Sequence, residues 1–199
     1  MADLNCIFIP LKHRFCGIAY YTYNLRPSVA HFLHLIVKTK TRKLENITIH
    51  NNLIPLPKQY DGITFPFISP NGHIFLRKSY FNKSELNMND ITAFLEILTH
   101  ECTHVKQIDR YSFLGFHFLP YVFAHLYYYC KAKSHDKSHL EYEPILRQSV
   151  FLEMNKYLNK TVAPYALARV IANEKLTECE KILQLNKLVN KYKITQKTD

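Results

Sequence analysis

One segment constrains the fold more than any other, because its apolar residues recur at helical spacing around two histidines. The apolar residues of this segment are Ile91, Phe94, Leu95, Leu98, Cys102 and Val105. The segment runs from about residue 89 to 110, and Asn89 or Asp90 can cap its start. At about 100° per residue, the apolar side chains lie nearly opposite His100 and His104. The pattern predicts a long helix that packs one side against a core and turns both histidines the other way.

The spacing of the two histidines is typical of a metal site. The chain reads His100-Glu101-Cys102-Thr103-His104. Residues four apart on a helix are separated by about 40° and about 6 Å along the axis, so two imidazoles can bind one ion. Glu101 lies on the flank of the same face, where a carboxylate can take a proton from a metal-bound water. We predict a Zn²⁺ site with Glu101 as general base. The alternative is a buried, purely structural histidine pair.

A catalytic zinc needs a third protein ligand and an open position. Gln107 and Arg110 stand three and six residues after His104, where metzincins carry Gly and His, so the third ligand must come from further along. The acids further along include Glu141 and Glu143. They point about 160° apart on a helix, so only one of them can face the ion. Weaker candidates are His117, His125, His135, Asp136 and His139.

The predicted zinc helix and the residues after it resemble the gluzincin peptidases. That group has an HExxHxxQ core, matched by residues 97–107, and a downstream ExE element, matched by Glu141-Tyr142-Glu143 after an aromatic stretch. The strand expected at 74–77 is also similar to the strand upstream of the helix in that group. The resemblance covers about residues 62–150. It implies a zincin-like peptidase fold, with Glu141 as the third zinc ligand.

The two residues after the ExE element differ from those of many gluzincins. Many of those proteins continue with Ala and Asp, whereas this chain has Pro144 and Ile145, so an acid that orients a ligand histidine is not found there. Glu96 or Glu143 could serve instead. Pro144 fits the first turn of a helix, with Glu141 just before or at its start. The group that stabilises an oxyanion is unassigned among Tyr111, Tyr142, His139 and Arg147.

Around this helix we expect a mainly helical α+β domain with a small sheet. Residues 62–68 and 73–78 are predicted to form a β-hairpin across the turn at 69–72, and Pro66 places the first strand at an edge. The strand at 73–78 could bind an extended substrate by edge pairing. Residues 1–25 fit short strands or loop. Further helices are predicted over 29–37, 141–159 and about 163–192.

A stretch without Asp, Glu, Lys or Arg covers residues 113–130 and raises the question of a membrane span. Gly115, Pro120 and four tyrosines within it suit a buried helix with polar groups better than a helix that faces lipid. We therefore predict a buried helix and no transmembrane segment.

Length and composition bound the domain count and the compartment. The 199 residues, 47% of them hydrophobic, fit one domain over 1–199, with a core at about 62–150 and C-terminal helices at about 151–195. The five cysteines never form a CxxC pair, which argues against a disulfide framework and a thiolate zinc site. The first residues lack the pattern of a secretory signal. We expect a cytoplasmic protein, or an effector exported by a non-Sec route.

The formal net charge of +10 favours anionic partners of any kind. The densest basic run covers residues 38–43 without interleaved aromatic residues, so no clear nucleic-acid site is predicted. Together with the metal motif, the sequence favours a zinc-dependent peptidase acting on a protein or peptide substrate. The alternative is a catalytically weak, metal-stabilised binding protein or effector that recruits an anionic partner through its basic surface.

Overall fold

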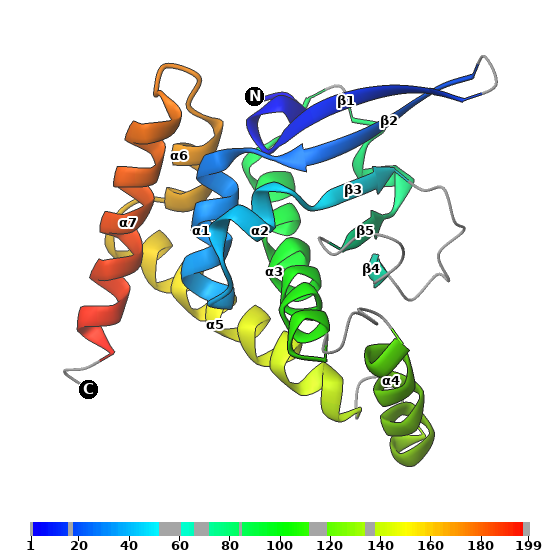
Figure 1. Ribbon diagram of the computed structural model, residues 1–199. Helices are drawn as coiled ribbons and strands as arrows, with labels where there is room; N and C mark the ends of the chain where they lie inside the picture. The colour runs from blue at the N-terminus through cyan, green and yellow to red at the C-terminus, as the bar shows by residue number, and fades with distance from the viewer. Residues whose placement is uncertain are drawn as a thin grey trace.

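The computed structural model describes residues 2–15, 18–51, 61–65, 72–83, 85–111, 119–133 and 138–196, which form an α+β fold (Figure 1). Its strands are β1 (Phe8–Phe15), β2 (Ile18–Leu25), β3 (Thr48–Asn51), β4 (Gly62–Phe65) and β5 (His73–Leu76). Its α-helices are α1 (Pro27–Val37), α2 (Thr41–Glu45), α3 (Met88–Tyr111), α4 (Leu119–Ala132), α5 (His139–Thr161), α6 (Ala166–Ala172) and α7 (Glu178–Thr195). Two short 3₁₀ helices cover Leu4–Cys6 and Lys78–Tyr80.

The strands form one mixed sheet in the order β1-β2-β3-β5-β4. β4 and β5 pair antiparallel, with Phe65 opposite His73, so the predicted hairpin is confirmed, although its turn lies outside the described residues. β4 is an outer strand, as Pro66 indicated, and β1 is the outer strand at the other edge. The expectation that 73–78 offers an open edge is wrong, because β5 also pairs in parallel with β3. The pairing of β3 with β5 joins segments far apart in the chain, so no local sequence pattern predicts it.

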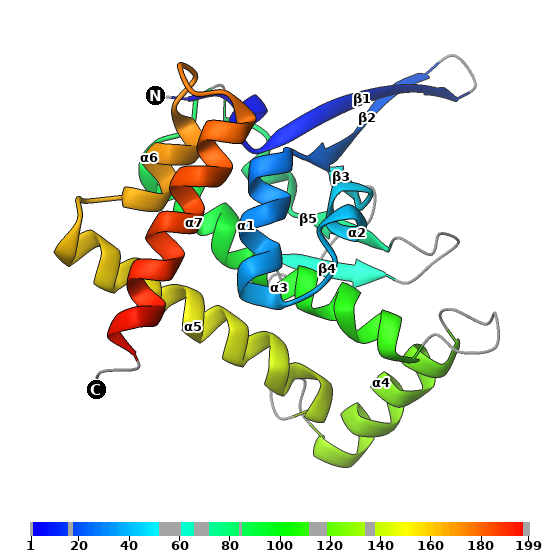
Figure 2. The same cartoon turned by 60° about the vertical axis from the view of Figure 1, so that its left-hand side comes forward.

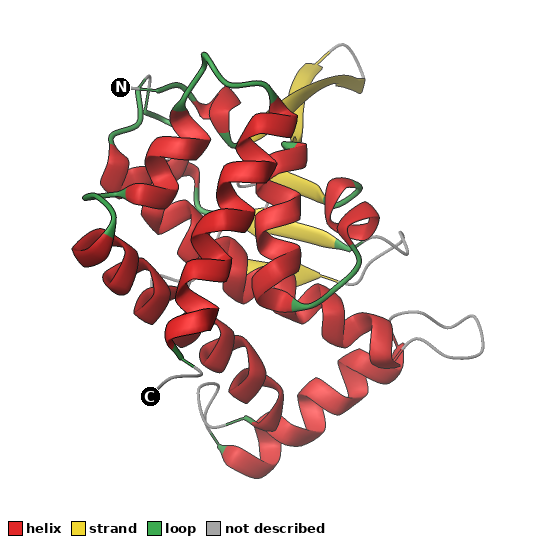
Figure 3. Ribbon diagram, turned by 90° about the vertical axis from the view of Figure 1, so that its left-hand side faces the viewer, coloured by secondary structure: helices red, strands yellow, loops and turns green. Residues whose placement is uncertain are grey.

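The helices gather on one side of the sheet (Figure 3), and a single buried cluster joins them to it. On the sheet side, Ile49 and Ile74 are fully buried. On α3, all six residues of the predicted apolar face are at most 1% exposed, which confirms the predicted orientation of this helix. α1 confirms the helix predicted over 29–37, with Pro27 at its first turn.

The start of α3 lies earlier than predicted. Asn87, not Asn89 or Asp90, precedes the helix, and its side-chain oxygen accepts a hydrogen bond from the Asp90 N–H at 3.0 Å. The Asp90 carboxylate in turn accepts from the Asn87 N–H at 3.0 Å. This reciprocal pair satisfies two N–H groups at the helix start. Asp90 therefore supports the cap from the first turn and does not form it.

The prediction of a buried helix within 113–130 is wrong for the part that the structure describes. α4 stands at the periphery (Figure 1), with Phe123 65% and Tyr127 60% exposed. The helix packs by one face only, where Tyr121 joins a small cluster with Ile108 and Leu140 that is separate from the main core. Among the described residues, no helix is both long and apolar enough to cross a membrane.

The C-terminal region divides where one helix was predicted. α5 covers and extends the predicted 141–159, but 163–192 contains both α6 and α7. The break is stabilised by a capping box in which the Thr177 hydroxyl accepts from the Glu180 N–H and the Glu180 carboxylate accepts from the Thr177 N–H. The prediction missed this signal because charged residues continue around an apolar stripe through the break.

Candidate metal centre

Helix α3 brings the two motif histidines together. The Nε2 atoms of His100 and His104 lie 3.3 Å apart, on the side of the helix opposite the apolar face. The His104 side chain is 7% exposed and that of His100 20%. The pair is therefore positioned by the burial of the opposite face, because rotating α3 to move the histidines would expose that face.

Helix α5 supplies Glu141 to the same point. α5 lies against α3 in both Figure 1 and Figure 2, and Glu141 stands in its first turn, 1% exposed. Glu141 Oε2 is 3.3 Å from His100 Nε2 and 3.4 Å from His104 Nε2. These three residues form a group whose ligand atoms all lie within 4.8 Å of one another. The structure thus brings together three side chains that could hold a metal ion.

Glu143 turns to a different set of partners. Its carboxylate lies 2.7 Å from Lys106 Nζ and 2.8 Å from Arg110 Nη1, and 3.8 Å from Arg147 Nη2. Partial burial opposes ionisation, but these cations, Lys106 first, lower the pKa of Glu143. The structure therefore places Glu141, and not Glu143, beside the histidines. Pro144 lies within α5, in its second turn and not its first.

Each histidine is held by a glutamine through its Nδ1 atom. His100 Nδ1 lies 3.2 Å from Gln148 Oε1, and the Gln148 amide nitrogen donates to Glu96 at 2.7 Å. Because the carboxylate can only accept, the amide oxygen of Gln148 must face His100, and His100 Nδ1 must carry the proton. Glu96 thus acts on the histidine through Gln148. The sequence suggested Glu96 as an acid that could orient a ligand histidine, and in the structure it does so through Gln148 and not by direct contact.

Gln107 plays the same part for His104. His104 Nδ1 lies 3.0 Å from Gln107 Oε1, while the Gln107 amide nitrogen donates to the Leu140 carbonyl at 2.7 Å. Pro144, four residues after Leu140, has no N–H with which to bond that carbonyl. Gln107 is 4% exposed, and through one amide it ties the His104 ring to the turn that carries Glu141.

With both Nδ1 atoms protonated, both Nε2 atoms present lone pairs to the Glu141 carboxylate. Three electron-rich atoms at 3.3 to 3.4 Å repel one another unless a metal ion or a proton lies between them. Tetrahedral zinc, bound at about 2.0 to 2.1 Å, separates its ligands by about 3.3 Å. The residues therefore fit a metal ion with tetrahedral geometry and ligand distances of this size. Burial alone would disfavour the charged ring, but Glu141 outweighs it and raises the pKa of His104.

Glu101 is held against β4, an outer strand of the sheet. It is 5% exposed, and the Thr64 hydroxyl donates to Glu101 Oε2 at 2.6 Å. Gly62, two residues earlier on β4, permits this approach, since a Cβ there would lie 2.9 Å from Glu101 Oε1. A carboxylate fixed in this way needs no rearrangement before it can take a proton. Thr64 gave no local sign of this contact in the sequence.

The remaining sequence candidates lie elsewhere or outside the described residues. His139 is exposed and packs on the Tyr128 ring at 5.0 Å, and His125 lies on α4 beside Tyr121. Tyr142 is 68% exposed, and Arg147 faces Glu143. The placements of His117, His135, Asp136 and the Tyr111 side chain are not described.

Besides Thr64, two further residues of the site were missed from the sequence. Tyr121 is 5% exposed, and its hydroxyl lies 3.1 Å from His104 Nδ1. Gln148 could have been found, because seven residues after Glu141 it returns to the same face of α5. Tyr121 carried no such signal, since it lies on a different helix.

No family model, curated protein or solved structure matches this chain.

Proposed function

We propose that this protein is a zinc-dependent peptidase, with His100, His104 and Glu141 as ligands. One observation carries the proposal: the three facing ligand atoms are separated by 3.3 to 3.4 Å, the spacing of a tetrahedral zinc shell. Zinc bound there would polarise the carbonyl of a peptide and lower the pKa of a water molecule. The resemblance to gluzincins supports the same ligand set.

Glu101 is the residue that turns metal binding into hydrolysis. We propose that it takes one proton from the attacking water as the water oxygen bonds to the peptide carbonyl carbon. When the C–N bond breaks, Glu101 returns this proton to the leaving amine, so that the carboxylate is regenerated. The Thr64 hydroxyl, which donates to Glu101 Oε2 at 2.6 Å, holds the carboxylate in one orientation throughout.

β4 is the strand that suits an extended substrate. It is one of the two outer strands of the described sheet, with β1 at the other edge, and through Thr64 and Gly62 it lies directly against Glu101. A peptide that pairs with its outer edge would run beside the proposed base. This replaces β5, whose two edges are both paired.

The test compares Glu101→Gln with the wild type on a peptide selected from a library. Gln keeps the size and most of the hydrogen bonding of Glu101, so zinc content should stay near one per chain. The kcat should fall by about 10² to 10⁴, the usual contribution of a general base. The exposed Glu174→Gln is the matched control and should change neither quantity. A His100→Ala/His104→Ala protein should lose the zinc.

Undiminished cleavage by Glu101→Gln would refute the peptidase mechanism. Equal zinc in the wild type and the double histidine variant would refute the metal site itself.

The second candidate is a metal-stabilised binding protein that recruits an anionic partner through its basic surface. The hydrogen bonds that tie both histidines to α5 favour it, because a metal at this point would also join α3 to α5 without any turnover. The two candidates differ in one measurement. The binding protein should retain zinc and stability in Glu101→Gln and should show no cleavage in either form.

A further inference from the structure

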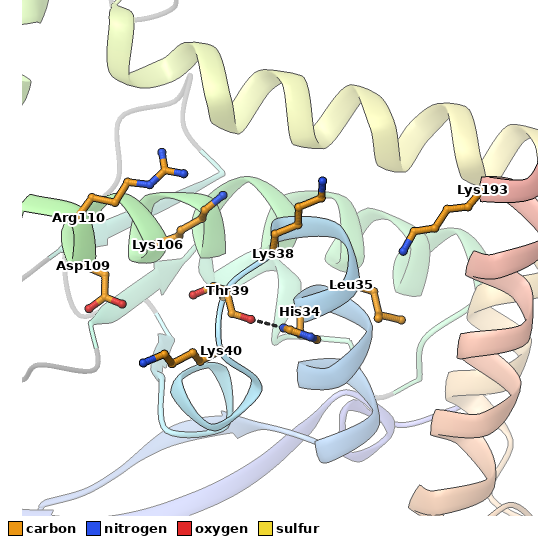
Figure 4. Close-up of a pocket in the computed structure, with 9 residues that line it drawn as sticks. All are labelled: His34, Leu35, Lys38, Thr39, Lys40, Lys106, Asp109, Arg110 and Lys193. Atoms are coloured by element: carbon orange, nitrogen blue, oxygen red, sulfur yellow. Dashed lines mark hydrogen bonds between the residues drawn. The ribbon is translucent and has the colours of Figure 1, made fainter. Parts of the chain in front are cut away.

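A strongly basic cavity lies on another side of α3. It has a volume of about 590 Å³ and opens between the end of α1, the last two turns of α3 and the last turn of α7 (Figure 4). Its charged lining consists of Lys38, Lys40, Lys106, Arg110, Lys193 and Asp109. On the helical wheel, Lys106 and Arg110 lie about 140° and 180° from Glu101. The cavity is therefore separate from the candidate metal centre, and its role does not depend on the proposed function.

The carboxylates near the cavity are already paired. Asp109 lies 2.5 Å from Lys43, and Glu143 bonds to Lys106 and Arg110. Lys38, Lys40 and Lys193 have no carboxylate partner within the described part of the chain. Positive charge therefore exceeds negative charge in the lining, and the like charges repel until an anion enters.

The backbone that carries two of these lysines is fixed in place. Lys38 ends α1 in the left-handed conformation, with φ 60° and ψ 47°, a position where glycine or asparagine is usual. Thr39 is buried, and its carbonyl accepts a hydrogen bond from the His34 ring. Lys40 directly precedes α2. The left-handed helix end and the anchored carbonyl together fix the path of the chain through this part of the cavity wall.

Four of the five cationic side chains extend in directions that suit a shared ligand, whereas the Lys40 side chain points away from them (Figure 4). Figure 4 shows Lys38, Lys106 and Arg110 extending to the same side, with Lys193 reaching in from α7. Separate ammonium groups bind phosphate oxygens as point charges. The described lining has no Phe or Tyr on which a nucleobase could stack, and Leu35 is its one aliphatic residue. The volume lies within the range of small-molecule sites.

We propose that this cavity binds a compact group carrying two or more phosphates, as a free small molecule or as a headgroup. Four cations around one cavity carry this inference: Lys106 and Arg110 from α3, Lys193 from α7, and Lys38, which ends α1 (Figure 4). The ligand would bring Lys38 together with Lys193, and so join the end of α1 to α7.

Inorganic tripolyphosphate is the probe, and its binding is measured by calorimetry at fixed ionic strength. A Lys38→Gln/Lys193→Gln pair should weaken binding by about tenfold or more, since each lysine near a phosphate contributes on the order of a factor of five. A Lys156→Gln/Lys160→Gln pair, exposed on α5, removes the same charge elsewhere and should weaken binding less than about twofold. Equal loss in both pairs, or no binding by the wild type, would overturn the proposal.

Lys38→Gly gives two readouts that move in opposite directions. Glycine relieves the left-handed conformation, so the Tm should rise by about 1 to 3 °C. Loss of the ammonium group should still weaken tripolyphosphate binding severalfold. A Tm that rises without any loss of affinity would contradict the proposal, because Lys38 would then not contact the anion.

Two further probes identify the source of the phosphates. Vesicles with a bisphosphorylated inositol lipid, compared with phosphatidylserine vesicles of equal charge, should be bound selectively if a headgroup is the ligand. Binding of tripolyphosphate without such selectivity would assign a free small molecule. A single-stranded oligonucleotide serves as the last probe. If it binds more tightly than tripolyphosphate, and if both lysine pairs weaken its binding equally, the result would replace the proposal with diffuse nucleic-acid binding.

Discussion

Replacing Gln107 with methionine tests how the two ligand helices hold the candidate metal centre. The substitution keeps the length of the buried side chain but removes its amide. Two hydrogen bonds disappear: the one from His104 Nδ1 at 3.0 Å and the one to the Leu140 carbonyl at 2.7 Å. We expect the first loss to affect zinc binding and the second to affect stability.

The magnitudes depend on the hydrogen bonds that each partner retains. The Leu140 carbonyl keeps no helical donor, because Pro144 lacks an N–H, and an unsatisfied buried carbonyl costs about 1 to 3 kcal/mol. For a chain of this length, that lowers the Tm by roughly 3 to 10 °C. His104 Nδ1 retains the Tyr121 oxygen at 3.1 Å. Zinc affinity should therefore fall toward the lower end of the range of about 10 to 100-fold seen when such a partner is removed.

The assay is a double-mutant cycle with Pro144→Ala. Alanine restores the N–H that can bond the Leu140 carbonyl, so it should stabilise the Gln107→Met protein about 1 kcal/mol more than it stabilises the wild type. Zinc affinity, measured by competition with a chelator, should remain low in the double variant, because His104 has not regained its acceptor. An additive cycle, or zinc affinity in Gln107→Met within about twofold of wild type, would refute this account of Gln107.

Two further predictions concern the third ligand and acid stability. Glu141→Gln should weaken zinc binding by at least about 100-fold. Glu143→Gln should retain the metal and lose only the ion pairs with Lys106 and Arg110. If metal analysis gives the reverse result, the roles of the two residues are exchanged. Burial, with charge on His73 and His13, lowers the pKa of His50 to about 4 from 6.5. The neutral ring therefore stabilises the fold above pH 6.5, and this contribution is lost as the pH falls from 6.5 to 4. His50→Gln should give a flatter Tm profile over that range, and an equally steep profile would contradict the assignment.

The sequence alone was sufficient for features that a single helix or hairpin decides. The apolar face of α3 and the position of His100 and His104 opposite it result from the 100° advance per residue, whatever packs around the helix. The pairing of β4 with β5 results from two apolar runs separated by turn residues. In both cases the residues that interact are close in the chain, so their spacing contains the geometry.

Features that depend on where a segment packs were decided by the tertiary structure. Glu141 and Glu143 are equivalent as residue types, and only the angle at which α5 meets α3 turns one to the histidines and the other to Lys106. In the same way, α4 is apolar enough to be buried, but no second layer covers its outer face among the described residues. A helix can bury only the face that a neighbour covers, and the sequence of that helix does not specify its neighbour.

The bonds around the metal centre show the same division. Thr64 meets Glu101 across 37 positions of the chain and Gln148 meets His100 across 48, so no local pattern encodes either contact. The basic cavity also arises only when the ends of α1, α3 and α7 converge. Helical periodicity determines which face of a helix a residue occupies. The burial of the shared core determines which faces meet. A site built from two elements therefore depends on how the core packs.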